Sequence, residues 1–98
     1  MKLLKEENFR GVMKGKAVAL FTLCNKNGCV AQFTNYGARW LSMWVPGKNN
    51  QWADVVLGFD SLDGYSNAGE KYYGAVIGRV CGRIDKGRFE LYGNKYQL

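Results

Sequence analysis

Arg79 and Arg83 lie among the apolar and glycine residues of the segment GAVIGRVCGRIDKGRFEL, residues 74–91. Its apolar residues predict a mostly buried, strand-like segment, but Arg side chains are rarely buried without a partner. Along a strand alternate residues share a face, so Arg79 and Arg83 would project in the same direction. A guanidinium presents a planar fork of donors that suits vicinal hydroxyls or carboxylates. The spacing therefore fits either a ligand site or two structural pairs with internal carboxylates.

The residues between and beside the arginines extend both interpretations. Cys81 would share the face of the two arginines. One interpretation is a reactive thiol whose pKa the flanking cations lower, and the other is a small buried side chain that fills the core. Gly78 and Gly82 would lie on the opposite face, where they could let another backbone or a ligand approach.

Other common catalytic groups are scarce. The chain has no His, which excludes Ser-His-Asp and Cys-His arrangements within it. The glycine-rich stretches match no phosphate-binding loop. The carboxylates could act as bases, but no spacing singles out a pair among Asp60, Asp63, Glu70 and Asp85. Three Cys without paired spacing argue against a disulfide framework and favour reduced thiols, and without His a zinc site lacks ligands, so no metal is expected.

The net charge of +6 in 98 residues is concentrated at the two ends. Residues 1–16 and 79–98 each carry a net charge of +3, and residues 17–78 are balanced. A basic patch for nucleic acid or an anionic substrate is one interpretation. The other is a solvated tail with ordinary strand-face charges, which the absence of any continuous basic run favours. We therefore expect no nucleic-acid partner.

Composition and pattern predict a β-rich chain, with 13 Gly, one Pro and many aromatic residues. Residues 1–16 predict a short helix or a loose arm. Two β-prone runs surround NKNG, whose Asn27-Gly28 pair is a hairpin signal. The run at 38–45 is apolar on both faces, with Trp40 and Trp44 predicted to share one of them.

The second half of the chain continues this pattern. PGKNN at 46–50 is a turn by composition. A strand is predicted at 53–59, followed by a helical turn capped by Asp60 or Ser61. A second hairpin signal lies at Gly93-Asn94.

The length fits one small domain, which we divide into an N-terminal arm at 1–17 and a β-sandwich portion at 18–98. The strand at 38–45 needs cover on both faces, so we expect a domain truncated at residue 98, or self-association of the fragment. MKLLKEENF has no apolar leader core, so a cytoplasmic location is expected, or a periplasmic or secreted one if a signal was removed. No apolar run approaches membrane-spanning length, and we expect no membrane partner.

Four stretches in order and in register resemble a known family: NYGAR at 35–39, DVVLGFDSLDGY at 54–65, YYGAVIGR at 72–79 and RIDKGRFELYGNKYQL at 83–98. They resemble the N-terminal part of the aldose 1-epimerases, or galactose mutarotases. The resemblance covers about residues 18–98. It implies an all-β fold, an antiparallel β-sandwich that is part of a large galactose-mutarotase-like supersandwich.

The resemblance also implies a chemistry, the interconversion of α and β anomers of aldoses of the galactose or glucose type. A Glu takes the proton from the C1 hydroxyl while a His protonates the ring oxygen, and the ring opens and closes without a cofactor. Both groups lie beyond the matched segment in the family, so this chain holds no catalytic residue and is predicted to be inactive alone.

The sugar-binding Arg of the family corresponds to Arg83. Gly82 stands where the family usually has a sugar-contacting Asn, and Arg79 is interpreted as support for the cleft wall. The predicted substrate-binding set is thus Arg83, with Gly82 and Arg79 as further candidates. The alternative function is a non-catalytic carbohydrate-binding protein on the same fold.

Overall fold

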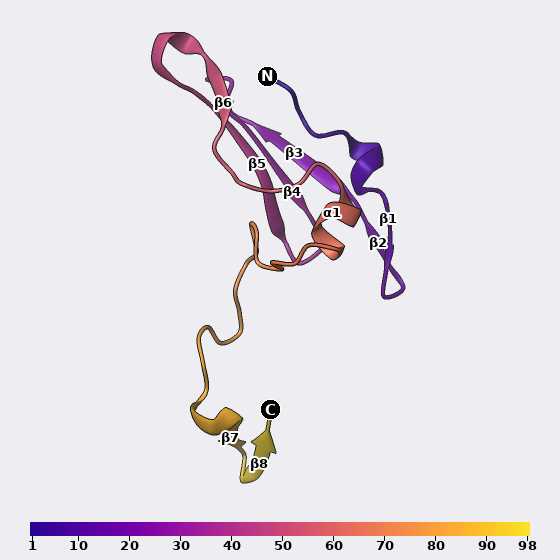
Figure 1. Cartoon of the computed structure of the whole chain (residues 1–98), viewed down its shortest axis with the longest axis vertical. Helices are drawn as coiled ribbons and strands as arrows, with labels where there is room; N and C mark the ends of the chain where they lie inside the picture. Colours follow the sequence, from indigo (N-terminus) through magenta and orange to yellow (C-terminus); the bar gives the residue numbers. More distant parts are fainter.

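The computed structural model describes residues 1–98 and shows an all-β chain with antiparallel strands (Figure 1). The predicted all-β, antiparallel class is confirmed. One sheet has four strands in the order β3-β4-β5-β6, and the pairs β1–β2 and β7–β8 form two-stranded sheets.

The chain contains no helix that is long and apolar enough to span a membrane. In chain order the elements are η1 (Glu6–Phe9), β1 (Gly11–Met13), β2 (Lys16–Val18), β3 (Leu20–Cys24), β4 (Val30–Thr34), β5 (Arg39–Pro46), η2 (Lys48–Asn50), β6 (Trp52–Asp54), α1 (Leu62–Ser66), η3 (Asp85–Gly87), β7 (Arg88–Leu91) and β8 (Asn94–Gln97).

Both predicted hairpins form, although the second turns at Tyr92 and Gly93, one residue before the predicted Gly93-Asn94 pair. In the β3–β4 loop the Asn25 side chain accepts hydrogen bonds from the backbone N–H of Asn27 at 3.0 Å and of Cys29 at 2.9 Å. Gly28 closes this loop with a φ of 88°, in the left-handed region that glycine occupies without strain. The β7–β8 turn places Tyr92 and Gly93 at positive φ, which is the geometry of a tight two-residue hairpin.

A bulge in β5 changes which side chains share a face. The β4–β5 register shifts between Gln32 and Phe33, which leaves Leu41 without a cross-strand partner. Trp40 therefore pairs with Phe33, and their rings stack with centroids 5.6 Å apart, while Trp44 pairs with Val30. Phe33 and Val30 lie on opposite faces of β4. The prediction that Trp40 and Trp44 share a face is wrong, because the extra residue inverts the alternation.

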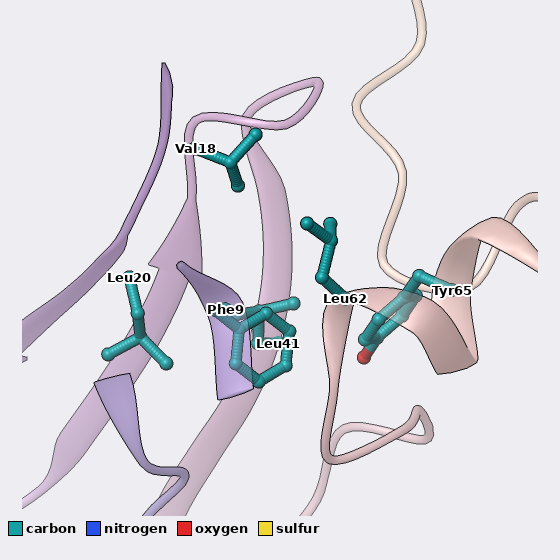
Figure 2. Close-up of a cluster of buried hydrophobic side chains, with 6 residues drawn as sticks. All are labelled: Phe9, Val18, Leu20, Leu41, Leu62 and Tyr65. Carbon is teal, nitrogen blue, oxygen red and sulfur yellow. The ribbon is translucent and has the colours of Figure 1, made fainter. Parts of the chain in front are cut away.

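The hydrophobic core lies on one face of the four-stranded sheet, where η1 and α1 cover it (Figure 2). Six buried side chains form this core: Phe9, Val18, Leu20, Leu41, Leu62 and Tyr65. Phe9 is fully buried, so the residues before β3 belong to the packed fold. The predicted helix or loose arm at 1–16 is in fact a single 3-10 turn followed by the β1–β2 hairpin.

A buried amide fixes the N-terminal residues to the sheet. Gln32, 1% exposed, accepts hydrogen bonds at Oε1 from Leu4 N and from Ser42 Oγ, both at 2.9 Å. Its Nε2 donates to Leu4 O at 3.1 Å and to Thr22 Oγ1 at 3.2 Å. All four hydrogen-bonding positions of the amide are thus occupied, as a buried polar group requires.

The predicted strand at 53–59 is present only as β6, which ends at Asp54. The Asp54 carboxylate accepts from Met43 N at 2.9 Å and from Val56 N at 3.1 Å, and so turns the chain out of the sheet. The predicted cap of the following helical turn is confirmed, because Ser61 Oγ accepts from Gly64 N at 3.1 Å.

Candidate functional site

The candidate sugar-binding residues lie in a segment without regular structure. Residues 74–84 form neither strand nor helix and connect the sheet region to the β7–β8 hairpin (Figure 1). The radius of gyration is 17.4 Å, against about 13 Å for a compact domain of this size. Residues 76–83 make no hydrogen bond. The segment thus departs from the body of the molecule.

The prediction of a buried, strand-like segment is therefore wrong for residues 74–84, while residues 88–91 do form the strand β7. Val76, Ile77 and Val80 are 65%, 59% and 66% exposed. An alternating apolar pattern indicates side chains that can be buried. A strand also needs a neighbouring backbone with which its N–H and C=O groups form hydrogen bonds. No strand of this chain lies beside residues 76–83, so neither the pairing nor the burial forms.

Arg79 and Arg83 are exposed and unpaired. Neither guanidinium takes part in an ion pair, and the ion pair that the chain does form joins Arg10 Nη2 to Glu6 Oε2 at 3.7 Å. The interpretation that both arginines pair with internal carboxylates does not hold in this structure. Both guanidinium groups keep their donors free for a ligand, and the assignment of Arg83 to a sugar site stays a prediction.

The neighbours of the arginines are equally open. Cys81 is an exposed free thiol, so it does not fill the core. A Cβ at Gly78 or at Gly82 would meet no atom within 4 Å, so no other backbone approaches there. Gly82 has a φ of 79°, a left-handed conformation in which a side chain other than Asn or Asp is disfavoured.

The start of this segment is held against β5 by a residue that sequence reasoning did not select. Arg39 donates from Nη1 to the carbonyl of Tyr73 and from Nη2 to the carbonyl of Lys71, the latter at 3.0 Å. Next to it, Trp40 N donates to the carbonyl of Gly74 at 2.9 Å. The available signal was an Arg at the start of an apolar strand, the same signal that singled out Arg79 and Arg83.

Gly74 itself shows how closely the two segments approach. Its φ is 66°, and a Cβ at this position would lie 2.0 Å from the carbonyl oxygen of Trp40. Only glycine fits that contact without displacing the backbone.

Aromatic rings surround the Arg39 guanidinium. Its Cζ lies 5.1 Å from the ring centroid of Tyr65 and 6.0 Å from that of Tyr36, distances at which a cation is attracted to the ring face. Burial raises the pKa of the Tyr65 phenol above its ordinary value. The phenol therefore stays neutral at physiological pH, and it has no hydrogen-bond partner for its buried oxygen.

The basic residues of the C-terminal end lie partly on the β7–β8 hairpin. Arg88 Nε donates to Gln97 Oε1 at 2.9 Å, and the rings of Phe89 and Tyr96 stack with centroids 5.0 Å apart. A hollow of about 470 Å³ lies along this hairpin. No group of three or more His, Cys, Asp or Glu side chains converges anywhere in the chain.

Residues 19–98 match the protein family described as aldose 1-epimerase. Galactose mutarotase of Bos taurus is 44% identical over 64 residues, and aldose 1-epimerase of Haemophilus influenzae is 40% identical over 84 residues. Galactose mutarotase of Homo sapiens is 42% identical over 64 residues.

These alignments differ greatly in how much of each protein they include. They cover 65% of this chain for the bovine and human proteins and 86% for the bacterial one. The same alignments cover 18% and 24% of the relatives. The chain thus spans about a fifth to a quarter of the length of these curated relatives.

Proposed function

Because this chain belongs to the aldose 1-epimerase family, we propose that it is the sugar-binding N-terminal segment of an enzyme that interconverts the α and β anomers of free aldoses. The observation that carries the proposal is the family match over residues 19–98, which includes the predicted sugar-binding Arg83. Relatives named galactose mutarotase and aldose 1-epimerase support a sugar of the galactose or glucose type as the substrate.

The reaction needs two proton transfers and one bond rotation. A base removes the proton of the C1 hydroxyl and an acid protonates the ring oxygen, so that the ring opens to the aldehyde. Rotation about C1–C2 then presents the other face of the carbonyl, and closure gives the other anomer. Such chemistry is efficient when one acid and one base have separated pKa values.

This chain supplies binding groups rather than the proton-transfer pair. It contains no His, and none of its four Glu matches the family's catalytic position. The exposed and unpaired guanidinium of Arg83 can donate to vicinal hydroxyls of a sugar without first breaking an internal contact. We therefore propose that the chain alone binds an aldose and does not accelerate its mutarotation.

The second candidate function is non-catalytic carbohydrate binding, and Gly82 is the observation that favours it. Glycine lacks the amide that the family usually presents beside Arg83, so one donor and one acceptor for the sugar are missing. The open space around Gly82 and its positive φ make Gly82→Asn a suitable test, because Asn tolerates this conformation better than most residues.

Polarimetry of fresh α-D-glucose and α-D-galactose tests the catalytic part of the proposal. We expect the same relaxation rate with and without the chain. A rate that rises in proportion to chain concentration would contradict the predicted inactivity.

Binding is tested separately, by titrating the ¹⁵N-labelled chain with D-galactose and following its amide resonances. We expect saturable shifts around Arg83 that Arg83→Ala abolishes and that Arg79→Lys, the matched control, retains. Tighter binding by Gly82→Asn would support a sugar site that includes position 82 beside Arg83. The absence of any shift in the unmodified chain would contradict sugar binding by this segment.

A further inference from the structure

The segment that carries Arg79 and Arg83 is attached to the sheet at one place. Downstream of Ala75, whose N–H donates to Tyr72 O at 3.0 Å, the backbone forms no hydrogen bond until Gly87 N, which donates to Ile84 O at 2.9 Å. Whatever fixes residues 71–74 therefore fixes the point from which both arginines depart.

Three hydrogen bonds attach residues 71–74 to β5, and two of them come from one side chain. A further bond, from Lys71 Nζ to Ser66 O at 2.9 Å, joins Lys71 to the last residue of α1. Arg39 reaches the carbonyls of Tyr73 and Lys71, and the third bond runs from Trp40 N to Gly74 O. Bonds from an ionised donor are roughly twice as strong as those between neutral groups. The planar fork of Arg can bond two carbonyls at once, which a lysine ammonium on a flexible stem does not reproduce.

The surroundings hold the guanidinium in the orientation that this bonding requires. Tyr65, a core residue of α1, lies under the guanidinium, and Tyr73 packs its ring edge-on against Phe59 at 5.5 Å. The side chain of Arg39 thus joins three parts of the chain: the strand β5, the helix α1 and the loop at 71–74.

We propose that Arg39 is a positioning residue, whose guanidinium clamps residues 71–74 to β5 and so sets the point from which the Arg83 segment leaves the sheet. The clamp itself is independent of the ligand. Its importance for sugar binding rests on the function proposed above.

Trypsin can report on the clamp, because the carbonyl of Lys71 belongs to a potential cleavage site. Cleavage of Lys71–Tyr72 requires that carbonyl to leave Arg39 and the Lys71 ammonium to leave Ser66 O. The Arg79–Val80 bond lies in the unbonded segment of the same chain. The ratio of the two initial rates, measured by mass spectrometry, is an internal measure of how firmly residues 71–74 are held.

We expect Arg39→Met to raise the rate at Lys71–Tyr72 relative to Arg79–Val80 by about tenfold or more, as the loss of charged hydrogen bonds predicts. Arg39→Lys should give an intermediate ratio, since it keeps the charge but not the fork. The control is Arg10→Met, which removes an exposed guanidinium paired with Glu6 and should leave the ratio unchanged. An unchanged ratio in Arg39→Met, or equal acceleration at both bonds, would overturn the clamp.

A second variant covers the case in which Arg39→Met does not fold. Gly74→Ala places a methyl group against the Trp40 carbonyl and 3.4 Å from Arg39 Cγ, so it meets the aliphatic part of that side chain and keeps the guanidinium itself. The clamp requires this variant to raise the same ratio and to speed hydrogen exchange of the Trp40 amide. If neither changes, residues 71–74 are not held as proposed.

The same digestion separates the clamp from the proposed function. D-galactose at saturation should slow cleavage at Arg83–Ile84 in the unmodified chain and protect it less in Arg39→Met. A chain without any protection by galactose would contradict sugar binding by Arg83, while the Lys71 to Arg79 ratio would still decide the clamp.

Discussion

Replacement of Gln32 by Leu tests whether the buried amide holds the N-terminal residues to the sheet. Gln32→Leu removes four hydrogen bonds, two of them to the backbone of Leu4 and one to Ser42. Each bond contributes about 1 kcal/mol net, and a buried polar group without a partner costs about 1–3 kcal/mol. Ser42, which is fully buried, loses its acceptor, whereas Thr22 is exposed and can bond water.

The gain from burying a Leu offsets part of this loss, so we expect a destabilisation of about 3 kcal/mol. That is a large fraction of the roughly 5–15 kcal/mol that stabilises a domain of this length. Urea unfolding, followed by the fluorescence of the three Trp residues, measures the change. The slope of the transition should stay constant if only stability changes.

A double-mutant cycle with Ser42→Ala separates the orphaned hydroxyl from other effects. In the Gln32→Leu background Ser42→Ala should recover about 1 kcal/mol, because the polar group without a partner is gone. In the unmodified chain the same change should destabilise. A Gln32→Leu variant within about 0.5 kcal/mol of the unmodified chain, or a Ser42→Ala effect of equal size and sign in both backgrounds, would refute the reasoning.

Two further predictions concern α1 and the aromatic cluster. Ser61→Ala removes the acceptor for Gly64 N and should lower the free energy of unfolding, measured with urea, by about 1 kcal/mol. Ser61→Asp keeps an acceptor and should retain most of the stability of the unmodified chain. Equal losses in both variants would contradict the cap. Burial raises the pKa of Tyr65, so the folded state keeps this proton at a pH where the unfolded chain has lost it. The stability that this group contributes is therefore full below the ordinary tyrosine pKa of about 10, and it is lost as the pH rises through the folded pKa. Urea unfolding measures the free energy of unfolding at each pH. Between about pH 9 and 11 that free energy should fall more steeply in the unmodified chain than in Tyr65→Phe. Parallel declines would contradict this assignment.

Local signals in the sequence were sufficient for the turns and for the class of fold. Asn27-Gly28 and Gly93-Asn94 predict hairpins, because Gly and Asn tolerate positive φ; both hairpins form, with Gly28 and Gly93 at positive φ. The Ser61 cap follows from the same kind of local chemistry. The family was also accessible from the sequence, since several motifs stand in register over residues 19–98.

The sequence indicates some residues of the candidate site and not others, and the sugar-binding role of Arg83 stays a prediction. Arg83 and Arg79 were selected because an Arg in an apolar run calls for an explanation, and the structure leaves both unpaired. Arg39 answers the same description, and it was not selected, because its partners are carbonyls more than 30 residues away. Backbone acceptors carry no signature in the sequence.

Long-range pairing decided the remaining features. The bulge at Leu41, which places Trp40 and Trp44 on opposite faces, arises from the register between two strands, whereas alternation along one strand gives no sign of it. Likewise, the run at 76–83 has the apolar pattern of a strand, but it lacks a neighbouring backbone to bond with.

The amino-acid sequence by itself determined the turns, the helix cap, the antiparallel all-β class and the family, because each depends on side chains and backbone preferences within a few residues or on matched motifs. Only the tertiary structure decided which residues pair, which faces are buried and what holds the segment that carries Arg83. Those features depend on contacts between residues that are distant along the chain. Their free energy comes from the pairing of backbone groups and the exclusion of water, and neither belongs to a single stretch of sequence.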